Sequence, residues 1–90
     1  MSKKIAVLVR DRQDEALRMA VGLTLMDDVI DVYVLDRKMN DSEENALNVE
    51  TLKDLSMHVY TNDAGNLGME YCPTEEIARR LSGYDQILPY

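Results

Sequence analysis

The 90-residue sequence predicts a small three-layer α/β fold, in which helices cover both faces of a doubly wound, parallel sheet of four to five strands. Three observations lead to this prediction. Residues 5–9 are consecutively apolar and mostly branched, as in a central strand that is buried on both faces. Charged residues follow this run at once, and a helical pattern begins after them. Short apolar runs then continue to alternate with helical segments, which implies right-handed crossovers between parallel strands.

The first helix is expected to begin at Asp11 or Arg12 and to end near Met26. Asp11 can cap its N-terminus, and Asp14 and Glu15 place negative charge in the first turn, where the helix dipole favours it. Apolar residues cover more than one narrow stripe of this helix, so we expect it to be well buried.

The second strand is expected over 29–35, with one apolar face and one face that carries Asp31 and Tyr33. Because the second face is partly polar, the pattern predicts a strand nearer the edge of the sheet, or one that meets a helix only in part.

The second helix is expected over 42–55, where Ser42 alone, or Asp41 together with Glu44, offers capping oxygens. Its predicted core stripe consists of Ala46, Val49, Leu52 and Leu55. Its predicted solvent-facing residues are Asn45, Asn48, Glu50 and Lys53.

The remaining predicted elements are a strand over 57–61, a helix over 74–82 and a final strand over 86–88. Residues 69–72 could add a short strand, although the loop before them is shorter than a usual parallel crossover. Thr74 can cap the last helix and Gly83 can end it. Pro89 places the final strand at a sheet edge.

Composition favours one domain over residues 1–90 with a single modest core. A hydrophobic content of 46% and a charged content of 30% are typical of a globular protein rather than a disordered one. The formal charge of −7 disfavours direct binding to nucleic acid or to an anionic membrane surface. Since neither a signal-peptide pattern nor a membrane-length apolar run appears, the expected compartment is the cytoplasm.

Cys72 is the sole cysteine, which excludes an internal disulfide. A thiol at the start of a helix can be activated as a nucleophilic thiolate by backbone N–H groups, whereas the acidic neighbours Glu70, Glu75 and Glu76 oppose this. The alternative is a small apolar residue packed beneath Tyr71 or the last helix. Cys72 is therefore the candidate catalytic residue, and the packing interpretation stays open beside it.

Four basic residues follow the first two predicted strands: Arg10, Arg12, Arg37 and Lys38. Because parallel strands end at the same sheet edge, these residues could gather there and bind a small anion, helped by the N-termini of two helices. The alternative is that they pair with Asp11, Asp36 and Asp41 as solvated loop charges.

Other chemistries find little support in the sequence. Asp11, Asp36 and Asp63 each follow a predicted strand and could form a magnesium pocket, but basic neighbours argue against it. His58 is the sole histidine, so no zinc site is expected. The phosphate-binding motifs G-x-x-x-x-G-K-[ST] and G-x-G-x-x-G do not occur. We therefore expect neither a metal nor a cofactor.

Five segments carry a family resemblance: K-K-I-A-V-L-V-R, E-A-L-R-M-A-V-G-L-T-L, I-D-V-Y-V-L, M-H-V-Y and E-E-I-A-R-R-L-S-G-Y-D-Q-I-L. Their order and their pattern of strands and helices resemble those of the DsrE/DsrF-like sulfur-relay family. The resemblance implies a DsrE-like, flavodoxin-like α/β fold, assembly into homo-oligomers or hetero-oligomers with related subunits, and sulfur donor or acceptor proteins as partners. It also implies that active members carry a persulfide on a cysteine just after the third strand.

The chain departs from the family at that point, because Thr61, Asn62 and Asp63 occupy the corresponding positions. The loop 64–68 also lacks the helix that the resemblance implies. Relatives without the cysteine occur as partner subunits, so two interpretations follow from the resemblance. In one, the chain is a sulfurtransferase or sulfur carrier in which Cys72 accepts sulfane sulfur. In the other, it is a non-catalytic oligomeric scaffold or a small-anion-binding subunit.

Under either interpretation we expect contacts between subunits through the edge strand 86–88 and through exposed side chains of Tyr84 and Tyr90.

Overall fold

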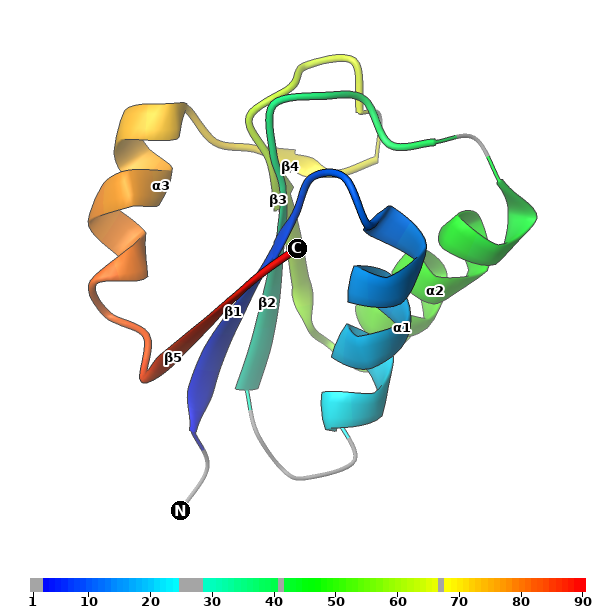
Figure 1. The fold of residues 1–90 in the computed structure, drawn as a ribbon, viewed down its shortest axis with the longest axis horizontal. Helices are drawn as coiled ribbons and strands as arrows, with labels where there is room; N and C mark the ends of the chain where they lie inside the picture. The colour runs from blue at the N-terminus through cyan, green and yellow to red at the C-terminus, as the bar shows by residue number, and fades with distance from the viewer. Residues whose placement is uncertain (1–2, 25–28, 41, 67) are drawn as a thin grey trace.

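The computed structural model describes residues 3–24, 29–40, 42–66 and 68–90. Its elements in chain order are β1 (Lys4–Val9), α1 (Gln13–Leu23), β2 (Val29–Val34), α2 (Glu43–Asp54), β3 (His58–Thr61), β4 (Glu70–Tyr71), α3 (Thr74–Leu81) and β5 (Gln86–Pro89). The five strands form one parallel sheet in the order β4-β3-β2-β1-β5. Helices α1 and α2 cover one face and α3 covers the other (Figure 1). The predicted three-layer, parallel α/β class is confirmed.

β1 is a central strand, as its unbroken apolar run predicted. It pairs with β2 on one side and with β5 on the other. Its side chains alternate between two cores, with Ile5, Val7 and Val9 facing α1 and α2, and Ala6 and Leu8 facing α3. The strand order reverses at β1, because β2 to β4 extend to one side and the chain returns to the other side for β5. The carboxyl end of β1 is therefore a topological switch point, where open α/β sheets often bind ligands.

The two cores differ in size. The larger core joins β1, β2 and β3 to α1 and α2, and its helical members are Ala16, Leu17, Ala20, Val49 and Leu52. The smaller core lies under α3 and contains Ala6, Leu8, Tyr33, Leu35, Cys72 and Ile77. A single short helix therefore covers the second face of the sheet.

β2 lies in the interior of the sheet, and the prediction that it lies nearer the edge is wrong. Its polar face is buried, with Asp31 5% exposed and Tyr33 fully enclosed. Tyr84, from the turn that follows α3, donates a hydrogen bond to Asp31 Oδ2 over 2.5 Å. The prediction failed because a polar residue in a strand usually faces solvent, whereas Asp31 is buried with a hydrogen-bond partner, Tyr84, that is distant in sequence.

The predicted helix caps are only partly confirmed. Ser42 caps α2, since its Oγ accepts a hydrogen bond from Asn45 N over 3.1 Å. Asp11 does not cap α1, whose N-cap is Arg12 without a side-chain hydrogen bond. Thr74 does not cap α3, because it is the first helical residue and follows the N-cap Pro73. The alternative cap Asp41 and the predicted helix end at Met26 lie outside the described residues.

The predicted faces of α2 also need correction. Val49 and Leu52 are buried as expected, but Ala46 and Leu55 are exposed, and Asn45 is fully buried. The buried stripe is therefore rotated toward Asn45, whose amide lies beside the loop that enters the helix and donates to Asn40 O over 3.5 Å.

β4 confirms the short additional strand that the sequence left open, and it pairs in parallel with β3. Its link to β3 consists of turns and bends at its described positions rather than a helix. Because α3 then passes to the opposite face, the face of β3 and β4 that adjoins α2 has no crossover helix of its own (Figure 1). The groove described below lies beside this uncovered part of the sheet.

In the part of the chain that the structure describes, no helix has the length and apolar character needed to cross a membrane.

Candidate functional site

Cys72 lies inside the smaller core, and only 2% of its surface is exposed. Its backbone N–H donates to Thr61 O over 2.7 Å, which continues the pairing of β3 and β4 by one residue. Its neighbours in the core include Leu8, Leu35 and Ile77. The thiol is thus placed where the packing interpretation put it, and a sulfur donor has no direct access to it in this conformation.

Three of the four predicted anion-binding residues are paired with carboxylates. Arg10 Nε lies 3.1 Å from Asp36 Oδ2, and Arg37 Nη1 lies 2.8 Å from Asp11 Oδ1. These two pairs cross between the loops that follow β1 and β2. Arg12 lies 3.7 Å from a carboxylate oxygen of Glu15, and its guanidinium carbon is 5.7 Å from the ring centroid of Tyr90. Arg10 and Arg37 therefore link neighbouring loops, Arg12 pairs locally at the start of α1, and the three do not converge on one empty site.

Asp36 anchors this edge of the sheet. Its backbone N–H donates to Asn62 Oδ1 over 2.7 Å, and its carboxylate accepts from Asn62 Nδ2 over 3.1 Å. Hydrogen bonds from Asn62 and Arg10 lower the pKa of Asp36 below its ordinary value. Its φ of 66° lies in the left-handed region, which aspartate tolerates better than most residues. The pairs are exposed to solvent, so each adds little to stability.

The N-terminus of α1 is unsuited to an anion. A small hollow of about 200 Å³ lies there, and it is lined by Asp11, Asp14 and Glu15 together with Arg12, Gln13 and Asn40. Three carboxylates offset the attraction of the helix dipole. Among the residues that the structure describes, no group of three or more histidine, cysteine or acidic side chains could hold a metal ion.

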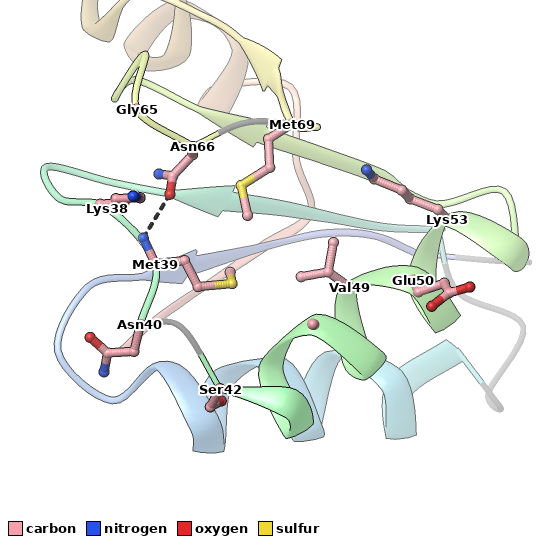
Figure 2. A pocket seen from close by; sticks show the side chains of 11 residues that line it. Lys38, Met39, Asn40, Ser42, Val49, Glu50, Lys53, Gly65, Asn66 and Met69 are labelled. Carbon is pink, nitrogen blue, oxygen red and sulfur yellow. Dashed lines mark hydrogen bonds between the residues drawn. The ribbon is translucent and has the colours of Figure 1, made fainter.

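A groove of about 460 Å³ lies beside α2, next to the part of the sheet where no helix connects β3 to β4 at the described positions. It is bounded by α2, the loop after β2 and the link between β3 and β4 (Figure 2). We call it the α2 groove, and its lining residues are Lys38, Met39, Asn40, Ser42, Ala46, Val49, Glu50, Lys53, Gly65, Asn66 and Met69. Its volume falls within the range of about 300–1,000 Å³ that is usual for ligand sites.

Asn66 holds the wall of the α2 groove in place. This residue is buried, and its Oδ1 accepts from Met39 N over 2.6 Å. Its Nδ2 donates to Arg37 O over 3.1 Å and to Thr61 Oγ1 over 2.9 Å. Thr61 Oγ1 in turn donates to Val34 O over 2.9 Å. One amide therefore joins the loop after β2 to the loop after β3, so the groove has a fixed wall.

The two lysines in the α2 groove differ from the arginines of the chain. Each of the six arginines forms at least one ion pair with a carboxylate. By contrast, within the described residues neither Lys38 nor Lys53 is in an ion pair. The Nζ of Lys53 donates to the carbonyl oxygen of Gly68, which is a neutral acceptor. Of the four predicted anion-binding residues, Lys38 is thus the one that lines a sizeable groove.

A polar and aromatic cluster lies on the opposite face, under α3. The Tyr84 hydroxyl donates to Asp31 and lies 2.7 Å from the Tyr33 hydroxyl. Tyr33 stacks on Tyr60 with ring centroids 5.0 Å apart. Burial, followed by the hydrogen bond to Asp31, raises the pKa of Tyr84 well above its ordinary value. Among the described residues, Asp31 Oδ1 is buried without a hydrogen-bond partner.

The expectation that Tyr84 and Tyr90 are exposed is wrong, because both side chains are half-buried, whereas the contacts between subunits stay a prediction. Tyr84 is held in the cluster just described. Tyr90 is half-buried, because its hydroxyl donates to Met19 Sδ and its carbonyl accepts from the backbone N–H groups of Arg10 and Asp11. Tyr84 packs against the smaller core and Tyr90 against the larger one.

Comparison with known proteins places no relative beside this chain: no family model, curated protein or solved structure matches it. The assignment of a function therefore depends on the geometry above and on the resemblance seen in the sequence.

The sequence did not single out two residues that shape the site. Asn66 stood in a segment dense in turn formers, where asparagine is unremarkable. Lys53 was placed on the exposed side of α2, which is correct, but its proximity to Gly68 depends on the path of a loop. One sequence signal could have indicated the α2 groove: the segment 64–68 has no helical pattern, so part of the sheet beside α2 is left without a covering helix.

Proposed function

We propose that this chain is a non-catalytic subunit of DsrE-like type, which binds and positions a sulfur-carrier partner and does not carry sulfur itself. The observation behind this proposal is the burial of Cys72. A persulfide carrier must expose its sulfur to a donor and then to an acceptor, whereas this thiol is 2% exposed and packed under α3.

The charges near the sheet edge support the same choice. A persulfide anion needs cations that are free to approach it. Arg10 and Arg37 are instead committed to carboxylates, and Arg12 lies beside Tyr90 at the start of α1. Cys72 belongs to the core on the α3 side, which none of these three arginines joins.

The edges of the sheet offer surfaces for association with related subunits. β5 is an edge strand, and Ile87 on it is 41% exposed. β4 forms the opposite edge, where Tyr71 is 57% exposed. Unpaired edge strands with exposed apolar side chains readily pair with another chain. A subunit that assembles through these edges could place a partner's reactive cysteine without supplying one.

Intact-protein mass spectrometry after incubation with a sulfane-sulfur donor tests the proposal. The wild type and Cys72→Ser should both keep their mass under native conditions, because the thiol is enclosed. Unfolding the wild type in denaturant before the incubation should permit the gain of one sulfur atom, which verifies that the donor is active. A gain in the native wild type that is absent from Cys72→Ser would overturn the proposal and make the chain a sulfur carrier.

A further inference from the structure

We infer that the α2 groove is a binding site for a small amphipathic anion, with an apolar body and an anionic head group. This inference does not depend on a role in sulfur relay. Apolar side chains form the middle of the groove, and Lys38 and Lys53, which have no carboxylate partner among the described residues, lie toward its ends (Figure 2).

The middle of the groove suits an apolar body. Met39, Val49 and Met69 meet there: Val49 belongs to the larger core, and Met39 and Met69 are partly buried side chains that pack against it. Methionine side chains are flexible and polarisable, so they adapt to the shape of an apolar guest. Ala46 completes the wall on α2 without filling the space. Covering these groups with a ligand would remove apolar surface from water.

The charges favour an anion over a cation or a neutral ligand. Lys38 and Lys53 have no carboxylate partner among the described residues, in a chain whose formal charge is −7. Glu50 lines the same end of the groove as Lys53 and repels an anion there. The head group therefore lies toward Lys38, beside Gly65. Asp63 is also close to this end, where its Oδ1 accepts from Gly65 N over 2.8 Å, so its carboxylate reduces the attraction of Lys38 for an anion without lining the groove.

Two fluorescent probes test this inference. Anilinonaphthalene sulfonate has an apolar double ring and one sulfonate, and phenylnaphthylamine has the same rings without the charge. Titration of the folded wild type should show saturable binding of the sulfonate at one site per chain. Lys38→Gln should weaken sulfonate binding about two- to fivefold, since an exposed charge pair contributes modestly. Lys53→Gln should weaken it less, and neither variant should alter binding of the neutral probe.

Ala46→Glu is the sharpest variant, because it places a bulky carboxylate on the wall of the groove. It should weaken both probes, and the sulfonate by more than about tenfold. Leu47→Glu is the matched control, since it makes the same charge change at the next position of the same helix, where the side chain is 62% exposed and does not line the groove. Circular dichroism and urea denaturation verify that each variant is folded.

Each other outcome would overturn the inference. Equal sulfonate binding by Ala46→Glu and Leu47→Glu would place the probe elsewhere on the molecule. Unsaturable binding, or equal loss of both probes in Lys38→Gln, would remove the role of the cation. A dimer in light scattering that Ala46→Glu dissociates and Leu47→Glu leaves intact would identify a second copy of the chain as the occupant of the groove.

Discussion

Tyr84→Phe removes a single oxygen atom from the core under α3, and the consequence for stability can be worked out from the structure. The Tyr84 hydroxyl donates to Asp31 Oδ2 over 2.5 Å, and Asp31 is 5% exposed. Among the described residues, the other carboxylate oxygen, Oδ1, has no partner. The substitution therefore leaves a buried carboxylate without any hydrogen bond from the residues seen here. It also takes away the hydroxyl that lies 2.7 Å from Tyr33 Oη.

The expected loss is about 2–4 kcal/mol in the free energy of unfolding. A hydrogen bond to a charged group contributes about 1.5–3 kcal/mol, and a buried group left unpaired adds its desolvation penalty. For a domain whose total stability is of order 5–15 kcal/mol, such a loss is readily measured. Urea denaturation followed by circular dichroism gives the difference between variant and wild type.

Two further variants make the test specific. Tyr71→Phe is the matched control, because the Tyr71 side chain is 57% exposed and its loss of a hydroxyl should change stability by less than about 0.5 kcal/mol. In an Asp31→Leu background, Tyr84→Phe should lower the free energy of unfolding by less than about 1 kcal/mol, because no buried carboxylate is left without its hydrogen-bond donor. A similar cost for Tyr84→Phe with and without Asp31 would refute the reasoning, because the two residues would then be energetically independent.

Three further predictions concern pH, a helix cap and the wall of the α2 groove. Burial and the hydrogen bond to Asp31 raise the pKa of Tyr84, so the folded state keeps the hydroxyl proton at a pH where the unfolded chain loses it. The free energy of unfolding should therefore fall as the pH rises above about 10. Urea denaturation at several pH values should show this fall in the wild type and a less steep fall in Tyr84→Phe. Ser42→Ala should lower the free energy of unfolding by about 1 kcal/mol in urea denaturation, because it removes the cap of α2. Ser82→Ala should lower it by less, because the Ser82 hydroxyl donates to Arg79 O at the end of α3. Equal losses would contradict the assignment of Ser42 as the cap of α2. Asn66→Ala should lower the free energy of unfolding by about 2–4 kcal/mol in the same assay, because it removes three hydrogen bonds of a buried amide. The control Asn40→Ala should lower it by less than about 0.5 kcal/mol, because Asn40 is exposed. A small loss for Asn66→Ala would show that these hydrogen bonds do not hold the wall of the α2 groove.

The layers of the fold were predictable because local pattern and burial agree along β1 and α1. The run 5–9 is apolar on both faces and is covered on both faces. The position of β2 was not predictable in the same way. One oxygen of the Asp31 carboxylate accepts from Tyr84, 53 residues away, and strand periodicity carries no information about such a partner. Polar residues with long-range partners are where an inference from local pattern fails.

The candidate site was less predictable than the fold. The sequence brought Arg10, Arg37 and Lys38 to one sheet edge, and the structure places them there. It left open whether they would face an empty crevice or pair with their acidic neighbours. That outcome depends on side-chain directions in loops, which residue spacing does not fix. Two of these residues form crossed ion pairs, whereas Lys38 points to the α2 groove.

The connection between β3 and β4, which has no helix at its described positions, explains why a groove exists in so small a domain. Uncovered strands usually expose large apolar surfaces, and here three features limit that exposure. β4 is only two residues long, Met39 and Met69 fold over the strip beside α2, and Lys53 reaches across it to the carbonyl of Gly68. Long, flexible side chains thus cover the position that a crossover helix would occupy. Because such side chains move at little cost, they can shield the sheet when the groove is empty and line it when an amphipathic anion enters.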